Sequence, residues 1–178
     1  TRTFIRDAAT GRQLAQLEQF TTRRDGRVIH AANFNFWGVT FARDDKTFYA
    51  TLGSGDKTYL VQGDIKRREM KVLREGVECP SLSPDGTRIA FKQREGGGVG
   101  PVQWRPAVLD LATLRARTLA ETRNVDDQIE WFDNEHVSYG LPESASSPVT
   151  DVWKVPAAGG GRPERVLSGA WSPAVVRG

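Results

Sequence analysis

The chain contains little of the chemistry on which disulfide scaffolds and many active sites depend. Its 178 residues include one cysteine, Cys79, and only two histidines, His30 and His136. A single cysteine excludes an internal disulfide and any metal site built from several thiolates. It leaves the redox compartment open, because a chain without disulfides is stable in reducing and oxidising surroundings alike. We expect Cys79 itself to be a mostly buried thiol without a catalytic role.

Long apolar runs are also absent. No stretch is long enough to cross a membrane as a helix, so we expect no membrane insertion of this chain. The first residues carry neither a starting methionine nor the pattern of a signal peptide, and we expect the natural chain to begin before Thr1. No segment keeps a sustained helical period.

The charges show no concentrated patch of one sign. There are 25 Lys and Arg against 22 Asp and Glu, a net charge of +3, and the basic residues are scattered singly or in pairs. A nucleic-acid partner is therefore not expected, because such proteins gather basic residues into a stripe or patch.

What the sequence does contain is a repeated pair of short strands around a tight turn. Ser83-Pro84-Asp85-Gly86 is typical turn chemistry, and Ile89 and Phe91 follow with the period of two of a strand that is buried on one face. Residues 41–50 align with residues 82–91 without a gap, and residues 131–139 align with a turn one residue shorter. The spacing between copies is close to the roughly 40–45-residue period of WD40-type propeller blades.

A second pair of short apolar runs follows each copy of the first pair. Asp64 and Asp110 each end the first run of their pair, and Asp7 occupies the corresponding place near the N-terminus. We expect these three carboxylates to bond nearby backbone N–H groups in hairpin turns rather than to bind a ligand. Four short strands per repeat, joined by turns, predict an all-β propeller of four-stranded antiparallel blades.

The segment Ser83-Pro84-Asp85-Gly86-Thr87-Arg88-Ile89-Ala90-Phe91 resembles the PD40 repeat, the WD40-like motif of TolB-like β-propellers. The resemblance covers nearly the whole chain and implies a six-bladed propeller in full-length members of that family. This chain would hold three complete blades and one split blade within a single domain over residues 1–178, as a fragment of such a propeller. The expected parts are a partial blade at 1–20, blades at 36–74, 78–120 and 126–168, and a closing first strand at 170–177.

No catalytic constellation, cofactor motif or metal site is predicted. The two histidines lack a recognisable Ser or carboxylate partner, and Gly53-Ser54-Gly55 is not a nucleophile elbow. The glycines at 96–98 lack the Lys-Ser/Thr of a phosphate loop, so we interpret them as a loop between strands. The acidic group of Asp126, Asp127, Glu130, Asp133 and Glu135 has no EF-hand spacing, so solvated turns are favoured over Ca²⁺ binding.

The topology of a blade predicts where a partner would bind. Turns after strands one and three lie at one end of the strands, and the loop after strand two and the connection between blades lie at the other. The second end carries the long, dissimilar segments, and irregular loops on a rigid scaffold usually carry recognition. We therefore predict a partner-binding surface at that end, with aromatic anchors and charged neighbours. Its residues are Trp104, Trp171, Arg94, Arg105, Asp126 and Asp127.

The resemblance implies a non-enzymatic scaffold that binds another protein at the bacterial cell envelope, in the periplasm or another extracytoplasmic compartment. The alternative is an accessory propeller of a prolyl-oligopeptidase-type peptidase or of another hydrolase. A self-standing propeller hydrolase is disfavoured by the missing catalytic constellation. The fold alone does not choose among these functions.

Overall fold

The computed structural model describes residues 2–95, 102–144 and 146–176, and in these ranges regular structure is almost entirely β. One short 3-10 helix, η1 (Leu17–Gln19), stands among the strands. The predicted fold class, an all-β chain of four-stranded antiparallel sheets, is confirmed. The chain forms two compact units, the N-terminal unit Thr1–Pro80 and the C-terminal unit Ser81–Gly178, and each is described by itself.

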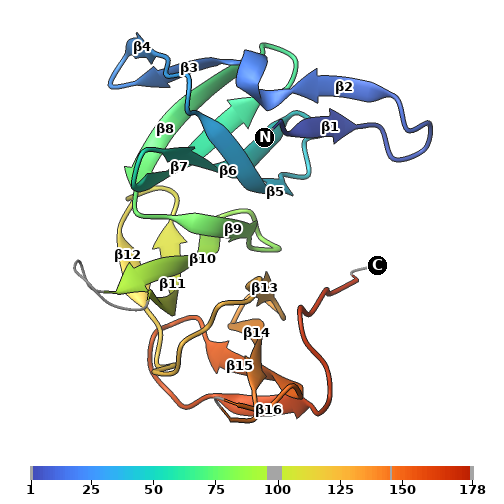
Figure 1. The fold of residues 1–178 in the computed structure, drawn as a ribbon, viewed down its shortest axis with the longest axis vertical. Helices are drawn as coiled ribbons and strands as arrows, with labels where there is room; N and C mark the ends of the chain where they lie inside the picture. The colour runs from blue at the N-terminus through green and yellow to red at the C-terminus, as the bar shows by residue number, and fades with distance from the viewer. Residues whose placement is uncertain (1, 96–101, 145, 177–178) are drawn as a thin grey trace. The chain divides into compact units, whose positions relative to one another are not determined.

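The N-terminal unit contains a two-stranded and a six-stranded sheet (Figure 1). Strands β1 and β2 form the antiparallel two-stranded sheet, and the larger sheet has the order β4-β3-β8-β7-β6-β5. Its antiparallel part, β5 to β8, corresponds to the first predicted complete blade. The bounds are β1 (Phe4–Arg6), β2 (Gln13–Gln16), β3 (Thr21–Arg24), β4 (Arg27–Ile29), β5 (Asn35–Phe41), β6 (Thr47–Ser54), β7 (Lys57–Asp64) and β8 (Glu69–Glu75).

The C-terminal unit is built on two four-stranded antiparallel sheets. Their strands follow in chain order, β9 to β12 and β13 to β16, as four-stranded blades require. The bounds are β9 (Glu78–Leu82), which begins in the N-terminal unit, β10 (Arg88–Glu95), β11 (Gln103–Asp110), β12 (Ala116–Thr118), β13 (Glu130–Trp131), β14 (His136–Pro142), β15 (Thr150–Pro156) and β16 (Glu164–Leu167). That residues 1–178 form a single domain stays a prediction.

Alternation along the strands supplies one apolar core in each unit. In the N-terminal unit Phe48, Leu52 and Met70 lie in this core, and in the C-terminal unit Trp131 and Tyr139 do so. All five side chains are almost fully buried.

The hairpin β3–β4 was not predicted beyond its turn. Strands flank the polar turn at Asp25 and Gly26 on both sides, a hairpin that the repeat pattern does not indicate. At its tip Asp25 and Gly26 have φ angles of 50° and 78°, the left-handed pair that a two-residue hairpin turn requires. Strand β3 then pairs in parallel with β8, which extends the blade to six strands.

The closing strand expected at 170–177 is not formed in the described part of that segment. Residues 170–176 contain no strand. Instead, the backbone N–H and the hydroxyl of Ser172 donate to the side chain of Asp127, at 2.9 and 2.5 Å. A strand needs a neighbouring backbone to bond with, and here a carboxylate takes that place.

The turn carboxylates bond locally, as predicted. Asp110 Oδ1 accepts hydrogen bonds from the N–H and hydroxyl of Thr113, and Asp7 does the same with Thr10. Asp64 accepts from the N–H groups of residues 66 and 67. These aspartates therefore set the shape of hairpin turns.

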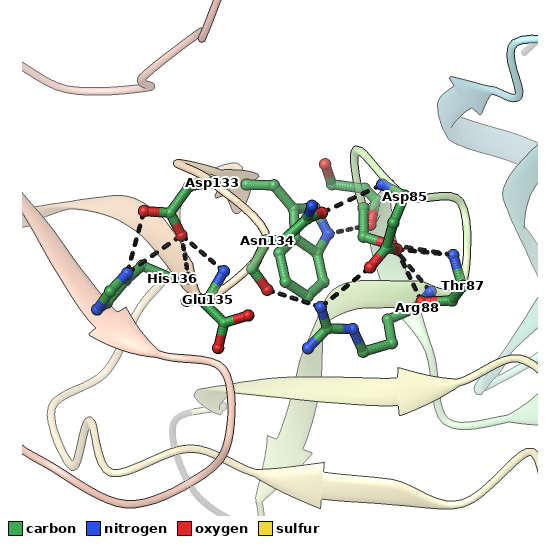
Figure 2. A network of polar contacts seen from close by, with 10 residues as sticks. Asp85, Thr87, Arg88, Asp133, Asn134, Glu135 and His136 are labelled. Atoms are coloured by element: carbon green, nitrogen blue, oxygen red, sulfur yellow. Dashed lines mark hydrogen bonds and ion pairs between the residues drawn. The ribbon is translucent and has the colours of Figure 1, made fainter.

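The turn at 83–86 is bonded to the corresponding turn of the next sheet (Figure 2). The Asp85 N–H donates to Asn134 Oδ1 at 3.1 Å, and the Arg88 guanidinium donates to the Asn134 carbonyl at 2.6 Å. The same guanidinium lies 5.0 Å from the Trp131 ring, whose indole N–H donates to the Ser81 carbonyl at 2.9 Å. The repeated turn is thus a structural link between two sheets.

The Asp85 carboxylate holds this turn in shape. Partial burial raises the pKa of the Asp85 carboxyl, but hydrogen bonds from Ser83 and Thr87 and the charge of Arg88 outweigh it. The net pKa lies well below the ordinary 3.8. The stabilisation is therefore fully present above pH 3.8 and is lost as the pH falls through the lowered pKa.

We predict that Asp85→Ala lowers the free energy of unfolding at pH 7 by about 1–2 kcal/mol, because several hydrogen bonds to a charged group are removed. Urea unfolding at a series of pH values measures this. The difference from the unmodified protein should shrink below pH 3.8. Asp56→Ala, in an exposed turn where the described residues make no such bonds to the carboxylate, is the matched control and should change stability by less than about 0.5 kcal/mol. Equal losses in both variants, or a difference that does not depend on pH, would contradict this role.

Candidate functional site

The six residues predicted to bind a partner are named here the tryptophan surface: Trp104, Trp171, Arg94, Arg105, Asp126 and Asp127. All lie in the C-terminal unit, at the end of the strands opposite to the turns of Figure 2. They come from the end of β10, the start of β11 and the segments that precede β13 and follow β16. The glycine-rich segment 96–101, also expected at this end, lies outside the described residues.

Trp104 is half-buried and fixed by its backbone. Its backbone N–H donates to Asn124 Oδ1 at 2.7 Å, and its backbone carbonyl accepts from the Val125 N–H at 3.0 Å. The Lys92 ammonium lies 5.0 Å from the centre of its ring. The indole is therefore held in one place with part of its surface exposed.

Lys92 connects Trp104 to Asp126. Its Nζ lies 2.7 Å from Asp126 Oδ1, and its side chain is 9% exposed while that of Asp126 is 64% exposed. A lysine at a buried strand position needs such a partner, because an unpaired buried charge is costly. Asp126 thus remains largely exposed while it neutralises the lysine that contacts Trp104.

The two arginines of the surface differ. Arg94 is exposed and lies opposite Trp104 in the register of β10 and β11, and among the described residues it has no ion pair. Arg105 is engaged inside the chain: its Nη1 lies 3.0 Å from Glu95 Oε1, and its Nε donates to the Glu121 carbonyl at 2.6 Å. Arg94 is therefore the more available cation.

Asp127 positions Trp171. It is buried, at 8% exposure, and its oxygens accept from Ser172 and from the Gly140 N–H at 2.7 Å. Trp171, the residue before Ser172, is left 66% exposed. A Cβ atom at Gly140 would lie 2.5 Å from Asp127 Oδ2 and 3.1 Å from Trp171 Cβ, so this close approach requires glycine.

The structure thus links the two tryptophans through a continuous series of contacts. Trp104 contacts Lys92, Lys92 binds Asp126, and the next residue, Asp127, holds Ser172 beside Trp171. Sequence reasoning missed Lys92. A signal existed in the repeat alignment, where Thr51, Lys92 and Gly140 occupy one position with three different chemistries.

A buried carboxylate supports the same end of the unit and was also missed. Glu121 is 1% exposed and receives two side-chain hydrogen bonds from Arg123, at 2.9 and 2.6 Å, and one from the Tyr139 hydroxyl at 2.8 Å. The Arg123 guanidinium also lies 4.0 Å from the Trp153 ring. The cluster joins β14, β15 and the segment after β12.

The pKa values in this cluster reflect burial and charge together. Burial raises the pKa of the Glu121 carboxyl, but hydrogen bonds from Arg123 and Tyr139 outweigh it, and the net pKa lies below the ordinary 4.5. Burial and the adjacent Glu121 carboxylate raise the pKa of the Tyr139 hydroxyl. Glu121 therefore stays ionised and Tyr139 neutral at physiological pH.

The acidic group that precedes and follows β13 has structural roles: the Ser81 hydroxyl donates to Glu130 Oε2 at 3.0 Å. Within the described residues, no group of three or more His, Cys, Asp or Glu side chains could hold a metal ion. Asp133 accepts from the N–H groups of Glu135 and His136, and the His136 ring lies 3.1 Å from the same carboxylate (Figure 2). No helix in the described ranges has the length and apolar character to cross a membrane.

Comparison with known proteins shows similarity only to solved structures. No protein-family model and no curated relative matches the chain. TolB from Acinetobacter baumannii is 15% identical over 78% of this chain, with a TM-score of 0.59. The β-propeller domain of the Trilobed protease from Pyrococcus furiosus is 18% identical over 76%, with a TM-score of 0.54. A puromycin-hydrolyzing peptidase from Mycobacterium tuberculosis is 19% identical over 98%, with a TM-score of 0.59.

The fold is that of TolB-like β-propellers. The resemblance stated from the sequence is thereby confirmed for the fold. The chain spans 34% of the TolB chain, 42% of the Trilobed protease domain and 25% of the puromycin-hydrolyzing peptidase. Each of these proteins is therefore considerably longer than the part that this chain matches.

We predict that Asp127→Asn loosens the segment around Trp171, because an amide cannot accept from Gly140 and Ser172 with the strength of a carboxylate. Hydrogen exchange should show faster exchange of the Gly140 and Ser172 amides. Asp126→Asn is the matched control, since Asp126 is exposed and its bond within the described ranges is to Lys92, not to Gly140 or Ser172. Unchanged exchange in Asp127→Asn would mean that the carboxylate does not hold this segment.

We predict that Glu121→Gln lowers the free energy of unfolding at pH 7 by about 2–3 kcal/mol, because buried hydrogen bonds to a charged group are weakened. The lowered pKa means that the stabilisation is present above pH 4.5 and is lost as the pH falls below it. Chemical unfolding between pH 7 and pH 3 measures both effects. The exposed Glu143 provides the control variant Glu143→Gln, which should leave stability nearly unchanged.

Proposed function

We propose that this chain is a non-enzymatic β-propeller scaffold that binds another protein through the tryptophan surface. The observation that carries the proposal is the exposed Trp171 side chain, whose backbone neighbour Ser172 is bonded to the buried Asp127. A large apolar side chain that is both exposed and fixed is typical of an interface anchor, because little conformational entropy is lost on binding.

Trp104 and Arg94 extend this surface. Trp104 adds a second fixed indole, and Arg94 adds a cation without an ion pair among the described residues. Tryptophan and arginine are the residues that most often dominate binding energy at protein interfaces. The fold is consistent with such a role, and we place the scaffold at the bacterial cell envelope, outside the cytoplasm, as the sequence resemblance implies.

A second candidate is an accessory propeller of a hydrolase. It is favoured by the similarity to the puromycin-hydrolyzing peptidase, which covers 98% of this chain, and by that to the propeller domain of the Trilobed protease. In that case the partner of the tryptophan surface would be a hydrolase catalytic domain. The two functions therefore differ in what binds rather than in where it binds.

A photo-crosslinking experiment tests the proposal. A photoreactive phenylalanine analogue replaces either Trp104 or Trp171, and the protein is exposed to an envelope extract of the organism that encodes it. We expect one partner to be crosslinked from both positions. Without the photoreactive residue, the Trp104→Ala, Trp171→Ala double variant should capture at least about tenfold less of this partner than the unmodified protein does. Phe132→Ala, which removes an exposed aromatic at the opposite end of the strands, should have no effect.

Two outcomes would change the conclusion. If the double variant captures the partner normally while changes near Asp85 abolish capture, the binding surface lies at the other end of the strands. If the captured partner reacts with a fluorophosphonate, a reagent for active serine hydrolases, the accessory role replaces the scaffold.

A further inference from the structure

A polar cavity of about 300 Å³ lies in the N-terminal unit, beside the strands β3 and β4 (Figure 1). Its lining comes from Arg2, from the end of β2, from η1, β3 and β4, and from the segment that leads into β5. The volume is at the lower end of the range for small-molecule sites, about 300–1,000 Å³. The cavity shares no residue with the tryptophan surface, so either site can fail without the other.

Thr22 places an unpaired hydroxyl in the buried part of this lining. It pairs with Met70 of β8, a member of the apolar core, and cross-strand partners share one face of a sheet. The residue is 2% exposed, and its Oγ1 has no hydrogen-bond partner among the described residues. A buried hydroxyl without a partner costs free energy, and a bound molecule that supplies the partner recovers that cost.

Aromatic rings make the rest of the buried lining apolar. Phe20 and Phe36 are buried and line the cavity. The Phe34 ring, which also lines it, meets the Phe36 ring edge to face with 6.5 Å between the ring centres. A wholly polar molecule would lose hydration against these rings without gaining hydrogen bonds, so the ligand needs an apolar part.

Two opposite charges line the same cavity without pairing with each other. Both oxygens of the Glu18 carboxylate accept the Thr3 N–H, at 2.9 and 3.1 Å, and each keeps capacity for a further donor. Arg2 is exposed and, like Glu18, has no ion pair within the described ranges. Gln16 and His30 add further hydrogen-bonding groups to the lining. A ligand that carries both a cation and an anion would therefore pair with both charges at once.

We infer that this cavity binds a small zwitterion, an α-amino acid with an apolar side chain. Its ammonium group pairs with Glu18, its carboxylate pairs with the Arg2 guanidinium, and its side chain lies against Phe20 and Phe36. The Thr22 hydroxyl forms a hydrogen bond with one of its polar groups. A molecule with only one of the two charges leaves the other charge of the cavity unpaired, which provides selectivity.

The probe is L-leucine, titrated into the full chain and followed in the ¹H–¹⁵N NMR spectrum. We expect saturable shifts of the amide signals around residues 16–22 and 29–36, with half-saturation below about 1 mM. Three compounds test the parts of the ligand: 4-methylpentanoate lacks the ammonium group, 3-methylbutylamine lacks the carboxylate, and glycine lacks the apolar side chain. Each should bind at least about tenfold more weakly than leucine.

Thr22→Val tests the buried hydroxyl, because a methyl group of similar size replaces it. The free variant should melt at the same temperature as the unmodified chain or higher, since no hydrogen bond within the described residues is lost. Leucine should nevertheless bind about threefold or more weakly to it, because one hydrogen bond to the ligand is missing. A role of the hydroxyl in the fold alone would give the opposite pattern.

Variants of the two charged residues test the ion pairs. Glu18→Gln keeps an acceptor for the Thr3 N–H but removes the charge, and Arg2→Gln removes the opposite charge. Each should weaken leucine binding at least about tenfold, whereas the same changes at exposed residues outside the cavity, Glu69→Gln and Arg12→Gln, should not. Thermal melts establish that each variant is folded.

Four results would overturn the inference. They are half-saturation above about 1 mM, shifts that lie outside the cavity, leucine binding no tighter than the three partial compounds, and equal affinities in the cavity variants and their controls. The comparison of leucine with the partial compounds uses the unmodified chain, so it decides the inference even where a variant fails to fold.

Discussion

The buried indole of Trp131 is the contact on which the packing of the C-terminal unit depends. It fills the space between two sheets, yet its N–H bonds to the Ser81 carbonyl in the first strand of the other sheet. A wide aromatic ring supplies apolar burial, and its single donor fixes the alignment of the two strands. Arg88 covers the ring and bonds to the next turn, so one end of both sheets is closed by compact turns. The opposite end is left with the longer segments that carry the tryptophan surface.

The same repeat imposes a backbone constraint at three of its corresponding positions. Gly38, Cys79 and Ser172 occupy one position of the repeat and have φ angles of 59°, 50° and 48°. Only the first is glycine, although a left-handed conformation costs other residues about 1–2 kcal/mol. Hydrogen bonds offset this cost: the Cys79 N–H donates to Thr51 Oγ1, and the Ser172 N–H donates to Asp127. Cys79 is accordingly only partly buried, less than its strand position predicted.

Local chemistry explains which features could be predicted from the sequence. The aspartate turns and the period of two are set by residues close in the chain, so Asp7, Asp64 and Asp110 behave as expected. Hairpin β3–β4 escaped prediction because its side chains are mostly polar and its place depends on pairing with β8, which is distant in sequence. Residues 172–176 resemble a first strand, but strand formation needs a neighbouring backbone that no local pattern reports.

On the tryptophan surface, too, residues that stand out locally were predicted and residues whose role depends on distant contacts were not. Loop position and residue type were sufficient to select Trp104 and Trp171, because large side chains on irregular segments stand out in a sequence. Lys92 and Glu121 could not be selected in this way, since their roles depend on contacts with residues distant in sequence, Asp126 for Lys92 and Tyr139 for Glu121. Their importance comes from burial, which forces each charge to find a partner.

Aromatic area rather than ion pairing determines binding at the tryptophan surface. On the tryptophan surface most charges are already paired within the chain, as in Lys92 with Asp126 and Arg105 with Glu95. Binding there depends on aromatic area, which salt affects little. The affinity of a partner for this surface should therefore change little with ionic strength, whereas an interface built on unpaired exposed charges would weaken as salt screens them.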